Sequence, residues 1–202
     1  MRTYRGRWLF LIVLLAGVLA FTGVWYFASA NKEEGGPDAG GFYVEGMAGA
    51  PSRVNPLFAA DNAVDQSLVS LVFAGLTRLD DKGIAFPDLA ETWTLSQDGT
   101  VYTFRLRPNL FWHDGKPLTA DDVVFTYDLA RSAGLTARVE VARVLEGATI
   151  TKLDALTVSI ALPRAYAPLP AYLTLGILPV HLLGGISVAQ LMDSPFNQHP
   201  VG

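Results

Sequence analysis

The chain contains no cysteine among its 202 residues. Without cysteine it can form no disulfide, and it has no thiol for lipid acylation, so a lipoprotein is excluded. It also lacks any run rich in lysine and arginine, and its formal net charge is −4. Because nucleic-acid binding depends on clustered basic side chains, this composition excludes a nucleic-acid partner. Since no disulfide can form, burial of apolar side chains must stabilise the fold.

Motifs of catalysis are missing as well. No G-x-S-x-G, S-x-x-K, P-loop or G-x-G-x-x-G pattern occurs. His113 and Asp114 are adjacent, whereas metal ligands usually stand at spacings such as i, i+4 or on separate strands. The other histidines, His181 and His199, are far away in the sequence. We therefore expect Asp114 and Gly115 to form a turn, and we expect neither enzyme activity nor a metal or cofactor.

A long apolar run stands near the N-terminus. Residues 8–28 contain no charged side chain and are numerous enough to cross the ~30 Å hydrocarbon core as a helix. Three arginines precede the run, and such flanks stay cytoplasmic, so the remainder is expected outside the membrane. Residues 28–30 (ASA) match a signal-peptidase pattern. The sequence leaves two alternatives open, an uncleaved signal anchor and a signal peptide cleaved after Ala30.

The composition changes after this run. Residues 31–41 (NKEEGGPDAGG) are charged, glycine-rich and without apolar periodicity, which is typical of a flexible linker. We expect three parts: a signal anchor or signal peptide at 1–30, a linker at 31–41 and a folded body at 42–202. The folded body would lie in the periplasm or at the cell surface.

Two β-hairpins are expected in the folded body. Residues 91–95 and 101–107 alternate between apolar and polar, and the four residues between them include Asp98-Gly99, a strong hairpin signal. A second hairpin is expected at 148–162, with its turn at Lys152–Ala155. The apolar residues that share one face are Tyr102, Phe104 and Leu106 in the first hairpin, and Leu156, Val158, Ile160 and Leu162 in the second.

Helices are expected beside these hairpins. Asn62 can cap one helix, and Gly75 can end it. Thr119 can cap another, with Asp122 reaching back to complete a capping box. A short helix is expected within 165–173. The first helix has an apolar face of Val64, Leu68, Leu71, Val72 and Leu76, and the second one of Val123, Val124, Tyr127 and Ala130. Hairpins mixed with helices indicate an α/β (mixed α+β) fold.

Six blocks of the sequence together resemble one known family. The chain is similar, in order and spacing, to the extracytoplasmic solute-binding proteins of ABC importers, family 5, the oligopeptide, dipeptide and nickel group. The stretch around FRLRPNLFWHDGKPLTADDVVFTYD carries most of the likeness. The block at 177–183 resembles a segment that forms a strand in this family. The matching blocks are 54–57, 70–80, 86–93, 102–128, 177–183 and 197–202.

The resemblance implies a fold and a function. Members are two-lobed, hinged proteins that close around a solute and pass it to a membrane permease. Residues 42–202 would form the N-terminal part of lobe I of this periplasmic-binding-protein fold. Members run to about twice this length or more, so the second lobe is missing and the chain resembles an N-terminal fragment. The expected partners are a short peptide or other small solute, ABC permease subunits and, through the N-terminal helix, the membrane.

The resemblance also implies a ligand site. Family members hold peptides largely by backbone pairing, as an added strand, which tolerates many peptide sequences. The residues carried over to this pairing are Ala60, Asp61 and Asn62, although Asn62 has a second explanation as a helix cap. The alternatives are a nickel, metal-chelate or oligosaccharide binder of the same family, an exported membrane-anchored hydrolase using His113 and Asp114, and a signal-anchored adhesion or sensor domain.

Overall fold

The computed structural model describes residues 17, 19, 22, 25, 41, 44–132 and 140–202. The chain divides into two units, residues 1–46 and residues 47–202. The expected membrane segment at 8–28, its cleavage site and the linker at 31–41 lie almost wholly outside the described residues, and they stay predictions. Within the described part of the chain, no helix is both long and apolar enough to cross a membrane.

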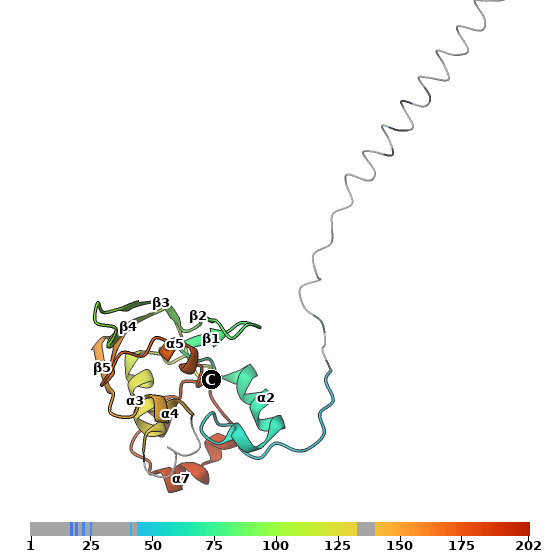
Figure 1. Cartoon of the computed structure of the whole chain (residues 1–202). Coiled ribbons are helices and arrows are strands. Elements are labelled where there is room, and N and C mark those ends of the chain that lie inside the picture. Colours follow the sequence, from blue (N-terminus) through green and yellow to red (C-terminus); the bar gives the residue numbers. More distant parts are fainter. Residues whose placement is uncertain are drawn as a thin grey trace, which may run out of the picture. The chain divides into compact units, whose positions relative to one another are not determined.

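The second unit contains a four-stranded antiparallel sheet (Figure 1). The strand order is β3-β4-β6-β5, so each expected hairpin supplies two neighbouring strands and both hairpins are confirmed. In the first hairpin Leu95 pairs with Tyr102, and Gly99 has a φ of 74°. The strands are β3 (Ala90–Leu95), β4 (Val101–Leu106), β5 (Thr149–Asp154) and β6 (Thr157–Ala161).

The second hairpin turns later than expected. Lys152 lies within β5, opposite Val158, and the strands close where Asp154 pairs with Thr157. The expected turn at 152–155 is therefore wrong. The Asp154 carboxylate explains the difference. It accepts a hydrogen bond from the backbone N–H of Leu156 at 2.8 Å, and this bond closes a tight turn between Asp154 and Thr157.

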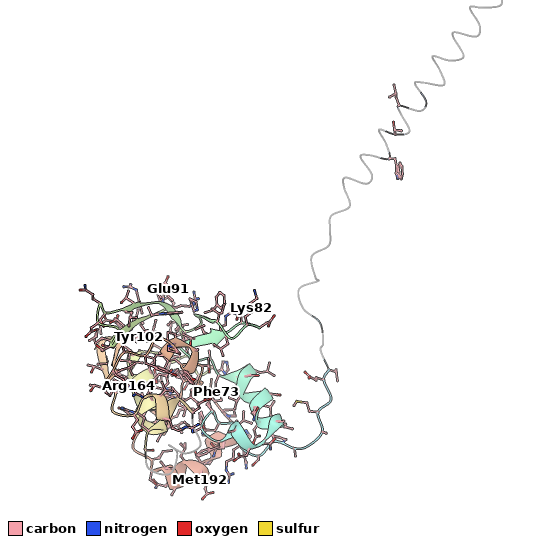
Figure 2. All side chains as sticks on the ribbon, in the orientation of Figure 1. Phe73, Lys82, Glu91, Tyr102, Arg164 and Met192 are labelled. Carbon is pink, nitrogen blue, oxygen red and sulfur yellow. The ribbon has the colours of Figure 1, made fainter. Side chains whose placement is uncertain are left out.

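One face of the sheet is buried under a helix. Helix α3 (Ala120–Ala130) packs against β5 and β6. Val123, Tyr127 and Ala130 are fully buried as expected, whereas Val124 is only half-buried. Figure 2 shows Tyr102 among the side chains of the sheet, and Glu91 on the same sheet. The buried sheet residues are Ala90, Tyr102, Phe104, Leu106, Val158 and Ile160.

The start of α3 confirms the expected capping box. The Thr119 side chain accepts a hydrogen bond from the Asp121 N–H, and Asp122 accepts one from the Thr119 N–H at 2.8 Å. The second Asp122 oxygen accepts from the Val180 N–H at 2.9 Å. One buried carboxylate therefore caps α3 and also fastens it to α6 (Val180–Leu183).

Helix α6 corrects the expectation of a strand at 177–183. Residues 180–183 form one short helical turn, with Pro179 as its N-cap residue in an extended conformation. Proline lacks the N–H that a strand ladder needs, and it is compatible with a helix start. The segment before it is tied to the core instead, because the Leu178 N–H donates to the buried Thr126 hydroxyl at 2.8 Å.

Helix α2 (Ala63–Val72) starts as expected and ends early. The Asn62 side chain accepts hydrogen bonds from the N–H groups of Val64 and Asp65, at 2.9 and 3.3 Å. The helix ends at Val72 with Phe73 as its C-cap residue, so the expectation that Gly75 terminates it is wrong. Gly75 is required by close packing, because a Cβ there would lie 2.7 Å from the backbone carbon of Thr174.

The apolar face expected on α2 is only partly covered. Leu71 is 82% exposed although it belongs to the expected apolar spacing. Val64, Leu68 and Val72 are half-buried, and Leu76 is fully buried but lies beyond the helix. Periodicity shows which side chains share a face, and it does not show how far tertiary packing covers that face.

The remaining elements are short. The β1–β2 hairpin carries Lys82 in its turn (Figure 2), and the helix expected within 165–173 is confirmed as α5. These elements are η1 (Ala59–Asp61), β1 (Thr77–Leu79), β2 (Ala85–Pro87), α4 (Glu140–Val144), α5 (Leu169–Tyr172), α7 (Val188–Met192) and η2 (Pro195–Asn197).

Candidate ligand-binding site

Two open hollows share a wall formed by Glu140 and Tyr172. The first, here called the apolar hollow, has a volume of about 690 Å³, and its lining includes Leu57, Ala60, Leu79 and Leu175. The second, the polar hollow, has a volume of about 700 Å³, and its lining includes Arg143, Glu146, Arg164 and Tyr166. Both volumes are of the size that small-ligand pockets usually have.

The structure distributes the three predicted site residues unequally. Ala60 lies in η1 and lines the apolar hollow, whereas Asp61 and Asn62 line neither hollow. The Ala60 carbonyl accepts a hydrogen bond from the Gln66 side-chain amide at 2.7 Å. The backbone N–H of Asn62 donates to the Ala59 carbonyl and its carbonyl accepts from the Gln66 N–H, so both groups are engaged within the fold. Backbone pairing of these residues with a ligand stays a prediction.

A buried asparagine pair holds the wall around Leu57. The Asn55 side-chain carbonyl accepts a hydrogen bond from the Leu57 N–H at 3.0 Å. Its amide donates to Asn197 Oδ1 at 2.9 Å, and the Asn197 amide donates in turn to the Leu191 carbonyl at 2.8 Å. Both asparagines are almost wholly buried. The segment before η1 is therefore fixed to α7 and η2, which lie near the other end of the chain.

The wall formed by α5 is fixed by two hydroxyl groups. The Tyr102 hydroxyl donates to the Tyr166 and Ala167 carbonyls at 3.1 and 3.2 Å, and burial raises the pKa of Tyr102. The Thr77 hydroxyl donates to the Pro170 carbonyl at 2.6 Å. These bonds hold the segment that carries Tyr166 and Tyr172 against β4 and β1.

The two tyrosines of this wall lie close together. Their ring centroids are 6.0 Å apart, and the ring planes form an angle of 42°. A hydrogen bond with the Tyr172 hydroxyl raises the pKa of Tyr166, and partial desolvation and the nearby Glu140 carboxylate act in the same direction. Two phenol groups and one carboxylate therefore converge where the two hollows meet.

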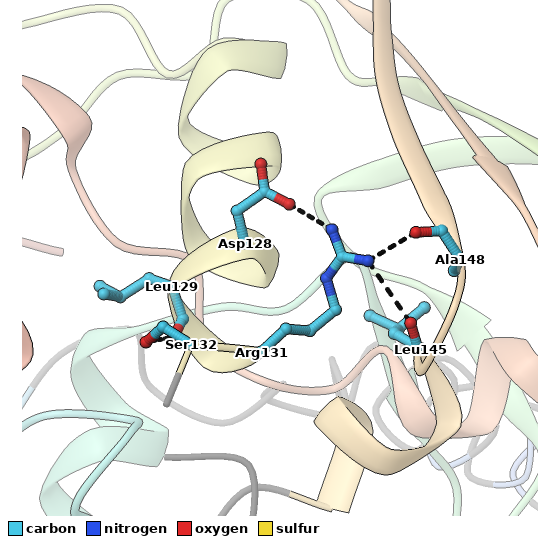
Figure 3. A network of polar contacts seen from close by, with 6 residues as sticks. All are labelled: Asp128, Leu129, Arg131, Ser132, Leu145 and Ala148. Atoms are coloured by element: carbon cyan, nitrogen blue, oxygen red, sulfur yellow. Dashed lines mark hydrogen bonds and ion pairs between the residues drawn. The ribbon is translucent and has the colours of Figure 1, made fainter. Parts of the chain in front are cut away.

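The wall formed by α4 is tied to the end of α3 by Arg131 (Figure 3). The Arg131 guanidinium donates to the carbonyls of Ala148 and Leu145, at 2.5 and 3.5 Å, and pairs with Asp128 on its own helix. Arg131 thereby joins the end of α3 to the connection between α4 and β5. This contact positions α4, whose first residue is Glu140.

The signals that place Glu140, Tyr166 and Tyr172 at the hollows are not local in the sequence. They belong to no motif, and they come together with Leu57 and Leu79 only through the fold. Sequence reasoning therefore missed them. Ala60 was reached only through the family resemblance.

The His113-Asp114 pair does not form a reactive centre. His113 Nδ1 accepts a hydrogen bond from the Gly202 N–H at 3.2 Å, whereas Asp114 accepts from the Lys116 N–H at 3.1 Å and pairs with His181 at 2.7 Å. The two side chains thus have different partners, and neither lines the two hollows described here. The expected turn is confirmed.

The pairing of Asp114 with His181 corrects one argument made from the sequence. Separation along the chain was taken to keep the other histidines away from this turn, yet His181 is in contact with it. The bond to His181, foremost, and the one from Lys116 lower the pKa of Asp114. Among the described residues, no group of three or more His, Cys, Asp or Glu side chains that could hold a metal ion is found.

The chain matches the family model described as bacterial extracellular solute-binding proteins, family 5 Middle, over residues 85–202. The chain belongs to this family. The sequence is 30% identical over 184 residues to the oligopeptide-binding protein AppA of Bacillus subtilis, covering 87% of this chain and 32% of AppA. It is 41% identical over 96 residues to the dipeptide-binding protein of Escherichia coli, covering 42% of this chain and 17% of that protein.

Solved structures agree with this family assignment. The solved structure of AppA from B. subtilis, in complex with a nonapeptide, superposes with a TM-score of 0.67 at 30% identity, covering 77% of this chain and 31% of AppA. NikZ from Campylobacter jejuni, in complex with Ni(L-His), gives 0.64 at 34% identity, covering 78% of this chain and 30% of NikZ. The mixed α/β fold is thus confirmed as that of periplasmic binding proteins. The chain spans about a third of the length of AppA.

Proposed function

We propose that this family 5 chain captures short peptides outside the cytoplasmic membrane and delivers them to the permease of an ABC importer, without transforming them. The observation that carries the proposal is the apolar hollow, which is of ligand size and includes Ala60, the residue that the family resemblance places in peptide pairing. The relatives named for oligopeptides and dipeptides support peptides as the solute class.

The proposal includes the organisation of the protein. Residues 42–202 form the N-terminal part of lobe I, a linker at 31–41 precedes them, and residues 8–28 hold the body at the outer face of the membrane. The permease subunits are the partners. A second lobe would close over the hollows, and in that arrangement Ala60 and Asp61 would offer backbone groups to the peptide while the Asn62 cap holds η1 in place.

Calorimetry on the purified 202-residue chain tests the proposal. Short peptides should bind measurably, whereas Ni–histidine chelates and mannohexaose should not. If only the chelate or only the sugar binds, the proposed solute class is wrong and that compound's class takes its place. An Ala60→Trp variant should weaken peptide binding, because the indole would fill part of the apolar hollow. Ser70→Trp, on the exposed face of α2, is the control and should bind like the unchanged chain.

A further inference from the structure

The apolar hollow contains one charged side chain among the described residues that line it, Glu140. The other lining side chains are apolar except for Thr174 and Tyr172. Within residues 44–132 and 140–202, no ion pair or hydrogen bond satisfies the Glu140 carboxylate. A single carboxylate at the side of an apolar groove is complementary to a ligand with an apolar stem and a positive end, as in a lysine side chain.

The aromatic wall adds a second preference for a cation. Tyr172 lines both hollows, is half-buried and stands beside Tyr166. Glu140 lies near enough to the pair to act on the Tyr166 hydroxyl electrostatically. The face of an aromatic ring attracts a nearby ammonium group, and a carboxylate next to it adds Coulomb attraction.

The two arginines described at these hollows belong to the polar one. Arg143 and Arg164 line the polar hollow and not the apolar one. Figure 2 labels Arg164 at its place in the fold. Among the described residues that line the apolar hollow no guanidinium is found, so a cation there would lie beside Glu140 and Tyr172.

We propose that the apolar hollow selects a cationic group of the bound peptide, held by the Glu140 carboxylate and the Tyr172 ring, while the alkyl stem packs against Leu57, Leu79 and Leu175. The cation is the ammonium of a lysine side chain or the N-terminal ammonium of the peptide. This inference rests on the proposed function and adds the chemical class of peptide that the site prefers.

Three tripeptides distinguish the two sources of the ammonium group. The probes are acetyl-Ala-Lys-Ala-amide, with a side-chain ammonium, Ala-norleucine-Ala-amide, with an N-terminal ammonium, and acetyl-Ala-norleucine-Ala-amide, with neither. Calorimetry on the 202-residue chain should show at least one charged probe binding roughly five- to tenfold more tightly than the neutral probe.

Matched variants assign the preference to this site. Glu140→Gln should reduce the advantage of the charged probe to about twofold or less, because it removes the counter-charge. Glu146→Gln is the control, since Glu146 lines only the polar hollow. Circular dichroism would confirm that both variants are folded. A Tyr172→Leu variant should weaken the charged probe more than the neutral one.

The outcomes separate this inference from the proposed function. Equal binding of all three probes, or an advantage that survives in Glu140→Gln, would overturn the inference and leave peptide binding intact. An advantage lost equally in Glu146→Gln would overturn the assignment to the apolar hollow. If the folded chain binds no probe and no other peptide, the proposed function fails and this inference fails with it.

Discussion

The Asp114 carboxylate and the His181 imidazole, 67 positions apart in the chain, meet at 2.7 Å between Oδ2 and Nε2. The contact joins the turn at 111–117 to α6. The Asp122 carboxylate reaches the start of the same helix through the Val180 N–H. Two acidic side chains, one in the turn and one at the start of α3, therefore fix α6 from two sides.

The Asp114 contact predicts a stability that depends on pH. The pKa of Asp114 is lowered, chiefly by the bond to His181. A lowered pKa in the folded state adds stability above the pKa of the unfolded carboxyl, about 3.9, and this stability is lost as the pH falls through the folded value. Asp114→Asn should therefore lower the urea midpoint near neutral pH, and its difference from the unchanged chain should close in acid.

Urea unfolding followed by tryptophan fluorescence, from about pH 7 down to about pH 2, measures this difference. Asp81→Asn, in the exposed β1–β2 turn, is the control and should show a small difference at every pH. If the difference in urea midpoint between Asp114→Asn and the unchanged chain stays constant into acid, the assigned role of the carboxylate is contradicted.

The two residues of the capping box should differ in importance. Thr119→Ala removes one cap acceptor and should cost about 1 kcal/mol of unfolding free energy. Asp122→Ala should cost more, about 2–3 kcal/mol, because it leaves both the Thr119 and Val180 N–H groups without their acceptor in a partly buried place. Chemical denaturation would measure both values. Equal losses would show that the link to Val180 contributes nothing to stability.

Local signals in the sequence predicted much of the fold. The caps at Asn62 and Thr119 and the Asp98-Gly99 hairpin depend on atoms within a few residues, so a short stretch contains all of their determinants. Distant contacts were not predictable in this way. The second Asp122 acceptor bond spans 58 positions and the Asp114–His181 pair spans 67, and no local pattern specifies either partner.

The candidate site was less predictable than the fold. Its walls come from η1, β1, α4 and α5, which meet only after the sheet and α3 are assembled. The family resemblance predicted Ala60. Glu140 and Tyr172 were identified only in the structure, as lining residues that the two hollows share. Asn62 shows the limit of both approaches, because its cap was predicted from local chemistry and its ligand role only by resemblance.

The buried pair of Asn55 and Asn197 should show strong energetic coupling. Asn197→Ala leaves the buried Asn55 Nδ2 without its partner and removes one of the donors to the Leu191 carbonyl, which keeps the Ser194 N–H, at a cost of about 1–3 kcal/mol. Asn55→Ala should cost a similar amount, since the Leu57 N–H also loses its acceptor. Because the single losses share one bond, the double variant should be less destabilised than their sum, by about 1 kcal/mol. Additive losses would show that the pair does not act as a unit.

Gly75 should connect core packing to ligand binding. A Cβ at position 75 would lie 2.7 Å from the Thr174 carbonyl carbon and 2.8 Å from its Cα, and backbone atoms cannot rotate away. Gly75→Ala must therefore displace the segment at 174–175, which lines the apolar hollow. We expect a loss of about 1–3 kcal/mol in unfolding free energy, together with weaker peptide binding under conditions where the variant is still folded.

Gly46→Ala is the matched control, because a Cβ there would meet no atom of the described residues within 4 Å. Unchanged affinity in a destabilised but folded Gly75→Ala protein would show that the 174–175 backbone takes no part in the peptide site.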